Sequence, residues 1–279
     1  MQQRTIGSLT VSAIGLGCMN MSMGYGPADD KTSIKLLNQA LDSGYTFLDT
    51  AMMYGEGHNE TLIGRAIESR RDEYVLATKC GLYRDKLDGR PEEIAGQCEA
   101  SLKRLGTDVI DLYYLHRIDP GVPVEDSVGA MSRLVEQGKV RELGLSEVST
   151  KSLHRAHKVH PIAALQSEYS LWSRTPERRI LDACAELGVT FVPFSPLARQ
   201  FLTGKAKDVT HLDDKDIRCT IARPRFEPEA FAENVKLLGP FGRVAEANNC
   251  SMAQLALAWL LAGQDGKMVP IPGTKHIDY

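Results

Sequence analysis

The chain has 279 residues, of which 43% are hydrophobic and 25% are charged, and its formal net charge is -3. This composition is typical of a folded globular protein, and the interspersed charges exclude the basic field that binding to nucleic acid or anionic lipid needs. No apolar run reaches the roughly 18 residues of a membrane-spanning helix, and the polar start lacks the apolar core of a signal peptide. We therefore expect a cytoplasmic protein with neither nucleic-acid nor membrane partners.

The six cysteines show no CxxC pair and no spacing typical of a disulfide framework or a zinc site. We interpret them as reduced thiols and expect no metal. Cys98 and Cys184 fall on the apolar stripes of predicted helices, where a thiol behaves as a small buried hydrophobic side chain.

Short β-rich runs alternate with helical patterns from residue 13 to residue 273, and no linker interrupts them. One helix has Pro91 in its first turn and Gly106 after its last apolar residue, and residues 251–254 have the pattern of a capping box. This alternation predicts a parallel sheet in a single domain that spans residues 1–279. The predicted strands are residues 13–17, 46–49, 74–78, 109–115, 142–145, 164–167, 189–194 and 268–271.

An open doubly wound sheet and a closed barrel share this alternation, and two features favour the barrel. The segment after the first strand contains Gly15 and Gly17 but lacks the third glycine of the dinucleotide-binding fingerprint. In a barrel, moreover, the carboxyl ends of all strands meet at one mouth. Polar residues lie at these ends, and we therefore predict a (β/α)8 barrel. The strand-end residues are Asp49, Lys79, His116, Ser146, Gln166, Ser195 and Thr274.

Four ionisable side chains follow three consecutive predicted strands. Asp49 ends one strand, Tyr54 starts the loop after it, and Lys79 and His116 follow the next two strands. Taken singly, each is best interpreted as a cap, a solvated charge or a packed ring. Together at one barrel mouth, they indicate a site for acid–base chemistry.

Several motifs that include these residues extend over nearly the whole chain. They are Asp49-Thr50-Ala51, Tyr54-Gly55 with Gly57, Asn59, Glu60 and Gly64, Thr78-Lys79, Leu115-His116-Arg117, Gly144-Leu145-Ser146, Phe194-Ser195-Pro196-Leu197 and Ile271-Pro272-Gly273-Thr274-Lys275. In this order they resemble the aldo-keto reductase superfamily, and most closely its bacterial branch related to potassium-channel β subunits. The resemblance implies a (β/α)8 enzyme that reduces aldehydes or ketones to alcohols with NADPH.

The resemblance implies that Tyr54 is the general acid and that Asp49, Lys79 and His116 complete a catalytic tetrad. Hydride attack on a carbonyl creates an alkoxide that must be protonated, and a free tyrosine, with a pKa of about 10, gives up its proton slowly near neutrality. We expect the Lys79 ammonium to lower that pKa, while Asp49 keeps Lys79 charged and oriented. We expect His116 to donate to or orient the carbonyl oxygen.

The resemblance also implies the contacts of the cofactor. Ser146 and Gln166 would bind the nicotinamide carboxamide, and Phe194 would lie under the nicotinamide ring. A loop after the seventh strand would bind the pyrophosphate. Its residues are Ser195, Pro196, Leu197 and Arg199, with Lys205 within reach of the same phosphates.

The 2′-phosphate of the cofactor is expected at the last motif, where Thr274 and Lys275 follow Gly273. A fixed cation at this position is the physical basis for choosing NADPH over NADH. The substrate is expected to be a small carbonyl compound. Met19, Met53 and Trp172 are candidate walls of its pocket, although ordinary packing explains them equally well.

The chain departs from the superfamily pattern at three points. Glu147 stands where an asparagine is common, and Phe194 stands where a tyrosine is common, so one hydroxyl is lost while stacking is kept. The sequence ends at Tyr279, where relatives continue through an eighth helix. We expect further residues beyond that point in the native protein.

Two other classes of protein share features with this sequence. A regulatory subunit that senses NADPH with little turnover would keep the barrel and the cofactor, and fold alone does not exclude it. The tetrad favours turnover over that alternative. A short-chain dehydrogenase requires Tyr-x-x-x-Lys, and none of the nine tyrosines has lysine four residues later.

Overall fold

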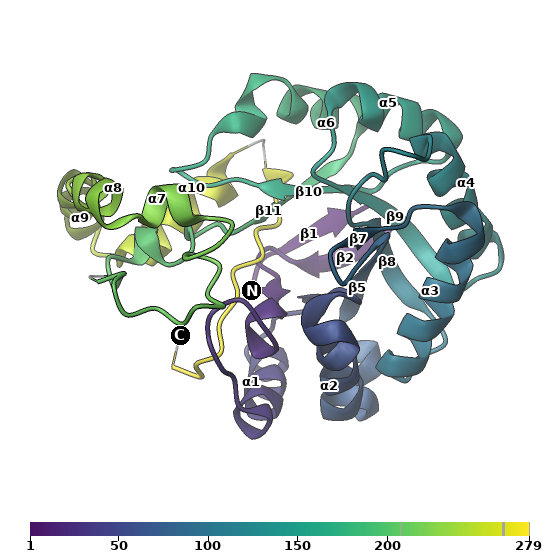
Figure 1. Ribbon diagram of the computed structural model, residues 1–279, viewed down its shortest axis with the longest axis horizontal. Helices are drawn as coiled ribbons and strands as arrows, with labels where there is room; N and C mark the ends of the chain where they lie inside the picture. Colours follow the sequence, from purple (N-terminus) through teal and green to yellow (C-terminus); the bar gives the residue numbers. More distant parts are fainter. Residues whose placement is uncertain (207, 264–265, 279) are drawn as a thin grey trace.

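The computed structural model describes residues 1–206, 208–263 and 266–278 and shows parallel strands surrounded by helices (Figure 1). Within this part of the chain, seven strands form one sheet, each parallel to its neighbour and in the order of the sequence. The strands are β3 (Leu16–Gly17), β4 (Phe47–Asp49), β5 (Val75–Cys80), β8 (Ile110–Leu115), β9 (Val140–Ser146), β10 (Ala164–Glu168) and β11 (Thr190–Phe194).

The segment 268–273 closes the barrel between β11 and β3. Val269 and Ile271 donate their N–H groups to carbonyls of β11 at 3.0 Å, and Gly15 and Gly17 donate to carbonyls of the segment at 2.9 and 3.0 Å. Those two carbonyls belong to prolines, which have no N–H to return to β3, so the ladder on that side is half complete. The eighth predicted strand is therefore an extended segment, and the predicted (β/α)8 class is confirmed.

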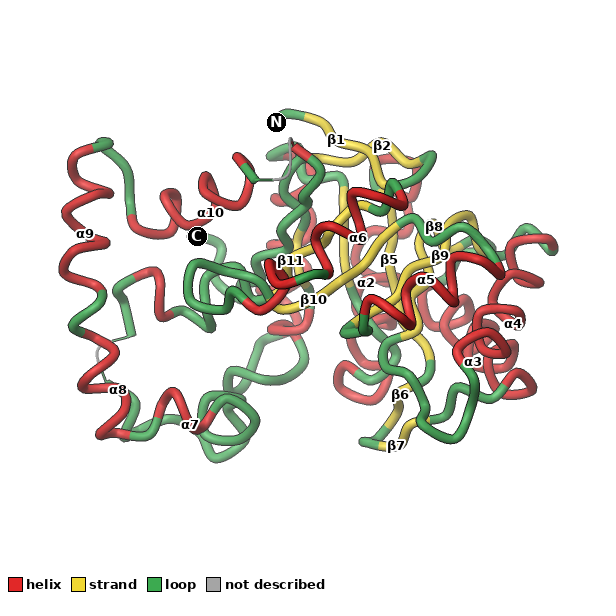
Figure 2. Tube along the Cα trace, turned by 90° about the horizontal axis from the view of Figure 1, so that it is seen from above, coloured by secondary structure: helices red, strands yellow, loops and turns green. Residues whose placement is uncertain are grey.

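Helices α1 to α6 surround the strands, and Figure 2 shows them from a second direction. Helix α1 buries Leu37 and Leu41, four residues apart on one face, against the sheet. As predicted, α3 has Pro91 in its first turn and ends before Gly106, which has a φ of 66°. The helices are α1 (Asp30–Asp42), α2 (His58–Ile67), α3 (Pro91–Leu105), α4 (Val124–Glu136), α5 (Thr150–Val159) and α6 (Ile180–Leu187).

Several helices lie between β11 and the closing segment, where strand–helix alternation predicts one. They lie together at one side of the barrel in Figure 1. The predicted capping box is present, because Ser251 accepts from the N–H of Gln254 and Gln254 accepts from the N–H of Ser251. The helices are α7 (Arg223–Phe226), α8 (Pro228–Val235), α9 (Leu238–Ala247) and α10 (Met252–Ala262).

Two short hairpins were not predicted. The N-terminal hairpin places Ile6 and Val11 in the apolar interior of the barrel, and the Thr190 hydroxyl at the start of β11 donates to its backbone at 2.9 Å. This hairpin therefore covers the amino ends of the strands and leaves the carboxyl ends open. The hairpin strands are β1 (Gln3–Ile6), β2 (Leu9–Ser12), β6 (Leu82–Tyr83) and β7 (Lys86–Leu87). The 3₁₀ turns are η1 (Met19–Met21), η2 (Tyr54–Gly57), η3 (Glu68–Glu73), η4 (Thr175–Arg178) and η5 (Phe201–Thr203).

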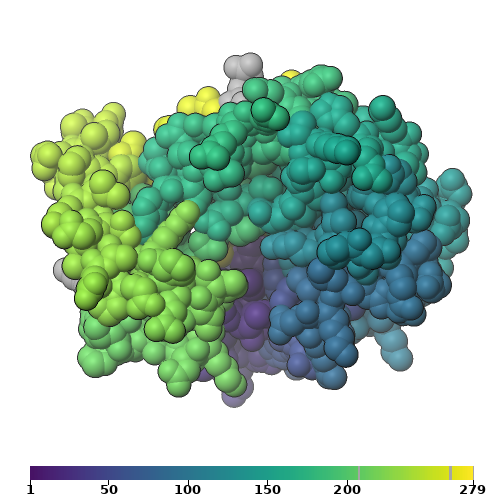
Figure 3. Space-filling model, turned by 45° about the horizontal axis from the view of Figure 1, so that its top comes forward, coloured from purple at the N-terminus to yellow at the C-terminus, as the bar shows by residue number. Residues whose placement is uncertain are grey.

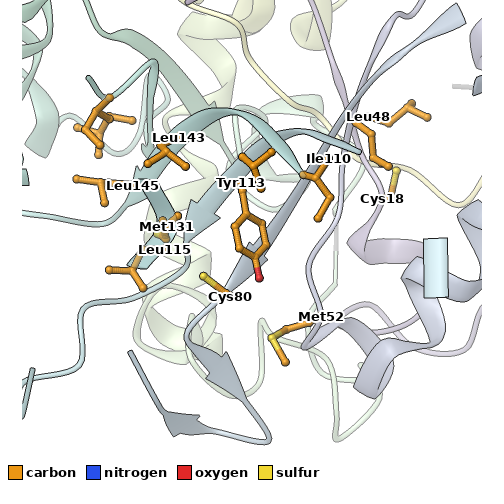
Figure 4. Close-up of a cluster of buried hydrophobic side chains, with 14 of the residues drawn as sticks. Cys18, Leu48, Met52, Cys80, Ile110, Tyr113, Leu115, Met131, Leu143 and Leu145 are labelled. Atoms are coloured by element: carbon orange, nitrogen blue, oxygen red, sulfur yellow. The ribbon is translucent and has the colours of Figure 1, made fainter. Parts of the chain in front are cut away.

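Apolar side chains fill two layers, as period-two alternation along the strands requires. Leu112 and Tyr114 of β8 belong to the cluster inside the barrel, whereas Tyr113 and Leu115 belong to the cluster between sheet and helices. Figure 4 shows the outer cluster around Tyr113. The sheet is therefore buried on both faces, as is usual for parallel strands.

The six cysteines are free thiols, and Cys98 and Cys184 are buried as predicted. Among the helices of the described residues, none combines the length and the apolar character that crossing a membrane requires.

Candidate active site

The four ionisable side chains predicted at the barrel mouth form one buried cluster. Asp49 ends β4, Lys79 lies near the end of β5, and His116 follows β8. The Nζ of Lys79 lies 2.5 Å from Oδ1 of Asp49 and 3.3 Å from the hydroxyl oxygen of Tyr54. The rings of Tyr54 and His116 meet edge to face, with centroids 6.1 Å apart. The strand ends therefore bring these groups together as expected from the sequence.

The ammonium group of Lys79 is fully buried but has three hydrogen-bond acceptors. These are Oδ1 of Asp49, the carbonyl of Thr50 at 2.7 Å and the oxygen of Tyr54. Because an ammonium group only donates, the Tyr54 oxygen accepts, and its own proton points elsewhere. The phenol proton is therefore left for a ligand at the mouth.

The turn that carries Tyr54 depends on glycine. Gly55, Glu56 and Gly57 all have left-handed backbones, with φ of 59°, 55° and 93°. A Cβ on Gly57 would lie 2.7 Å from Cδ of Arg104, so a larger residue meets both strain and a clash. The two glycines therefore permit a tight turn that positions Tyr54 beside the strand ends.

A row of buried polar side chains supports the cluster from behind. The Thr50 hydroxyl donates to Oδ1 of Asn59 at 2.6 Å. The hydroxyl of Thr78, which precedes Lys79, donates to Oε1 of Glu60 at 2.6 Å. The other oxygen of Glu60 accepts from Arg104 at 2.7 Å. Sequence reasoning missed Arg104, since it lies 44 residues from Glu60 in an ordinary helical pattern.

Burial and the neighbouring charges act in opposite directions on the pKa values of Tyr54 and Lys79. Burial raises the pKa of Tyr54 above its usual value, and the opposing effect of Lys79 does not cancel it. Lys79 does lower the pKa of Tyr54, as expected, but desolvation of the phenolate outweighs this attraction, so the net shift of the pKa is upward. For Lys79, burial lowers the pKa, but Asp49 and Tyr54 outweigh it and raise the pKa. At neutral pH, Lys79 is charged and Tyr54 is protonated.

His116 is held neutral at the same mouth. Burial lowers the pKa of this imidazole well below its usual value, and the charges of Lys79 and Arg117 lower it further. Within the described part of the chain, its buried Nδ1 has no hydrogen-bond partner. A neutral imidazole still has one N–H to donate. His116 therefore offers a hydrogen bond without a charge.

Three residues expected to contact nicotinamide lie at the neighbouring strand ends. Gln166 donates to Oδ2 of Asp49 at 2.7 Å, and Ser146 accepts from Arg117 at 2.9 Å. Phe194 is half-buried at the end of β11. Arg117 follows His116 in one of the sequence motifs but was not predicted to have a role. In the structure its guanidinium is a further cation at the mouth of the barrel.

The loop after β11 is strained. Ser195, Ala198, Arg199 and Gln200 have φ of 49°, 50°, 53° and 77°, in the left-handed region that non-glycine residues avoid. Such residues cost about 1 to 3 kcal/mol each and concentrate at functional sites. Left-handed backbones also form concave sets of N–H groups that bind anions. The conformation therefore suits the phosphate-binding role expected for residues 195–199.

The side chain of Arg199 is fixed by a carboxylate. Its two terminal nitrogens donate to the two oxygens of Glu168 at 2.9 and 2.7 Å, while its buried Nε has no partner among the described residues. Glu147 has a φ of 53° and accepts from the backbone N–H of Glu168 at 2.7 Å. Glu147 therefore supports this loop cluster, and the orphaned Nε is a donor that an anionic ligand would satisfy.

The last motif lies beside the loop that follows β3. The Nζ of Lys275 donates to the carbonyls of Tyr25 at 2.6 Å and of Pro27 at 2.8 Å. Arg218, which the sequence did not single out, lies 5.5 Å from the ring centroid of Tyr25 and is paired with a buried aspartate. Two cations therefore flank this loop. Of the other expected contacts, Gly273 packs against the backbone of β3, and the exposed Lys205 follows η5. The Thr274 hydroxyl donates to the carbonyl of His276 at 3.2 Å and accepts from its N–H at 3.0 Å.

The expected substrate walls are separated in the structure. Met19 begins η1, and Met53 directly precedes Tyr54. Trp172 instead stacks on Phe201 with centroids 4.0 Å apart, in a cluster formed by the segment after β11. In Figure 3 the surface is hollowed between this yellow-green segment and the blue part of the chain, with purple N-terminal residues inside the hollow.

Comparison with known proteins gives consistent matches. The sequence pattern of the Aldo/keto reductase family matches residues 13–279. The chain is 42% identical over 287 residues to the aldo-keto reductase yakc [NADP(+)] of Schizosaccharomyces pombe, covering 99% of this chain and 84% of that protein. It is 42% identical over 275 residues to a probable aldo-keto reductase 1 of Glycine max, covering 96% and 78%.

Solved structures agree in fold. The glycerol dehydrogenase AKR11B4 of Gluconobacter oxydans superposes with a TM-score of 0.89 at 28% identity, covering 99% of this chain and 87% of that one. An aldo/keto reductase of Klebsiella pneumoniae, solved in complex with NADP and acetate, superposes with a TM-score of 0.74 at 29% identity, covering 99% and 85%.

Proposed function

Since the chain belongs to the aldo/keto reductase family, we propose that it reduces aldehydes and ketones to alcohols with NADPH, with Tyr54 as the general acid. One observation carries the proposal. The buried Lys79 ammonium lies between Asp49 and the Tyr54 oxygen, at 2.5 and 3.3 Å. A structural salt bridge has no need of the phenol, whereas proton delivery does.

The residues divide the work of protonation. When bound, NADPH would supply a hydride to the carbonyl carbon, and the carbonyl oxygen would become an alkoxide. Tyr54 gives its free proton to the alkoxide oxygen, and the phenolate that remains lies against the Lys79 ammonium. Asp49 keeps Lys79 charged and in place. The ammonium therefore stabilises the negative charge that develops on the Tyr54 oxygen as its proton leaves.

His116 orients the carbonyl oxygen by a neutral hydrogen bond. Burial and two nearby cations keep its pKa low, so it does not compete with Tyr54 as a proton source. A preorganised donor at the oxygen stabilises the negative charge that forms there.

The loops after β9, β10 and β11 are proposed to hold the cofactor. Ser146 and Gln166 are candidates for the carboxamide, and Phe194 for the face of the ring. The strained loop and the orphaned Nε of Arg199 support a pyrophosphate site. The remaining candidates are Ser195, Pro196, Leu197 and Lys205 for the pyrophosphate, and Gly273, Thr274 and Lys275 for the 2′-phosphate.

The substrate is proposed to be a small carbonyl compound bounded by Met19 and Met53. Trp172 follows β10 and packs against the cluster formed by the segment after β11. The free thiols are those expected of a protein in a reducing compartment, which supports a cytoplasmic location.

Turnover of a carbonyl panel tests the proposal. NADPH is mixed with the purified protein and aldehydes of graded size, and its oxidation is followed by absorbance. We expect aldehyde-dependent oxidation with a kcat of about 1 to 10³ s⁻¹ and an equal yield of alcohol. Oxidation at the same rate with and without every aldehyde and ketone would contradict the proposal.

A further inference from the structure

A cleft lies apart from the candidate active site, since Asp49, Tyr54, Lys79 and His116 do not line it. Its volume is about 950 Å³. It lies between the start of α5, the η4 turn that leads into α6, and the start of α7, and Figure 1 labels these three helices. Pockets of this volume are large enough for a small organic ligand.

The cleft is strongly positive although the whole chain has a net charge of -3. Five cationic side chains line it against two carboxylates, Glu147 and Glu168. A concave surface with one sign of charge concentrates ligands of the opposite sign. The cations are Lys151, Arg178, Arg179, Arg199 and Arg225.

The two carboxylates are already engaged. Glu168 is bound by both terminal nitrogens of Arg199 and lies 3.5 Å from Arg225, and Glu147 accepts from a backbone N–H. The charge of Glu168 is therefore paired within the cleft, whereas Glu147 keeps its charge, and the five cations exceed the two carboxylates by three.

Three cations of the cleft remain unpaired. Lys151, Arg178 and Arg179 have no ion-pair partner within residues 1–206, 208–263 and 266–278. Nearby arginines are paired, since Arg155 binds a glutamate at 2.5 Å and Arg174 forms an ion pair with Glu177. The cleft therefore gathers three unpaired cations on one concave surface, beside arginines whose charges are paired.

An apolar side chain stands beside these cations. Ile221 is 80% exposed, which is the largest value among the exposed large hydrophobic residues described, and it lines the cleft together with Ile180 and Pro176. An isoleucine this exposed gains free energy if a ligand covers it. The cleft therefore combines uncompensated cations with an open apolar contact.

From this combination, we propose that the cleft binds a small organic anion. Its phosphate or carboxylate contacts Arg178 and Arg179, and its apolar body covers Ile221. The cleft borders the proposed cofactor site, because Arg199 lines it together with Glu147 and Glu168 of the neighbouring loops. Arg178, Arg179 and Ile221 are not among the proposed cofactor contacts, so we expect binding to persist when the cofactor site is filled.

Calorimetric titration of phenyl phosphate tests the site, using protein saturated with NADPH at low salt. We expect saturable binding with a dissociation constant of about 0.1 to 1 mM. The double variant Arg178→Gln/Arg179→Gln should weaken binding about tenfold or more, because it removes both charge-assisted donors. The control Lys103→Gln/Arg133→Gln removes the same charge from exposed positions on α3 and α4 and should leave the constant within about twofold.

The apolar half of the proposal has its own test. Ile221→Ser should weaken phenyl phosphate about threefold to tenfold while leaving the affinity for inorganic phosphate unchanged. Benzoate in place of phenyl phosphate distinguishes a carboxylate site from a phosphate site. Three results would overturn the proposal: no saturable binding of either anion, equal losses in the double variant and its control, or loss of binding when NADPH is added. The last would assign the anion to the cofactor site.

Discussion

Lys79 is the residue on which the candidate site depends. A buried ammonium is costly unless it is paired and hydrogen-bonded, and here three acceptors surround it. Removing Lys79 therefore has two separable consequences. It leaves Asp49 buried without its partner, and it removes the charge that stabilises a phenolate on Tyr54.

Lys79→Met is expected to lower stability by about 3 to 5 kcal/mol, because breaking a buried ion pair leaves one charge uncompensated. Adding Asp49→Asn should restore most of that stability without restoring turnover. Urea unfolding and steady-state kinetics on both variants check this. Recovery of turnover in the double variant would show that the ion pair only supports the fold.

The pH dependence of kcat follows from the charge states of Tyr54 and His116. The reactive form of Tyr54 is protonated and its pKa is raised, so reduction should persist into the alkaline range and fall only as the pH rises through that pKa. The pKa of His116 is lowered, so the imidazole stays neutral across the same range. We expect kcat at saturating NADPH to be flat from about pH 6 to about pH 9. A step in kcat near pH 6.5 would mean that His116 titrates normally.

At the level of elements, strand ends were predictable and the structure around them was less so. Polar residues that follow apolar runs, such as Asp49, Lys79 and Gln166, indicate where strands approach the mouth. The reason is that parallel strands are buried on both faces and reach polar surroundings only near their ends. The hairpin at the N-terminus lacks such a signal, since its strands are four residues long. The helices after β11 contain proline and glycine, as in α9 with Gly239 and Pro240, and these residues obscure helical periodicity.

The barrel seam is the element most sensitive to added volume. A Cβ on Gly17 would lie 2.9 Å from the carbonyl oxygen of Ile271, so Gly17→Ala should destabilise the fold by about 1 to 3 kcal/mol. Gly96 lies exposed in the middle of α3 with open space around it, and Gly96→Ala should stabilise by up to about 1 kcal/mol. Chemical denaturation compares the two. Equal effects of the two substitutions would show that β3 and the closing segment are not in close contact.

At the scale of the molecule, sequence reasoning found the tetrad but not the groups that hold it. Asp49, Tyr54, Lys79 and His116 follow a rule about strand ends, which a sequence displays. Arg104 meets its carboxylate only through the packing of α2 on α3, and no local pattern marks such a contact. The direction in which the pKa of Tyr54 shifts was also unpredictable, because it depends on how deeply the folded chain buries the phenol.

The proposed 2′-phosphate site joins segments from both ends of the chain. Lys275 joins the closing segment to the loop after β3, and the 2′-phosphate is proposed to bind there. We expect NADPH to bind more tightly than NADH by about 1.5 to 3 kcal/mol, a tenfold to hundredfold preference. Fluorescence titration of both cofactors measures it. Lys275→Gln should remove most of the preference and Lys275→Arg should keep it, whereas equal dissociation constants in the parent protein would rule out the role.

The most direct measurement is turnover of Tyr54→Phe beside a cofactor titration. Phenylalanine keeps the ring and its packing but has no proton to give, so aldehyde reduction should fall by a factor of about 10² to 10⁴ while NADPH affinity is unchanged. Tyr45→Phe, at a half-buried tyrosine packed against the outer core, serves as the control and should retain parent kinetics. If Tyr54→Phe reduces the aldehyde at the parent rate, Tyr54 is not the acid; if the parent binds NADPH but turns over no carbonyl, the chain is a sensor of the cofactor and not a reductase.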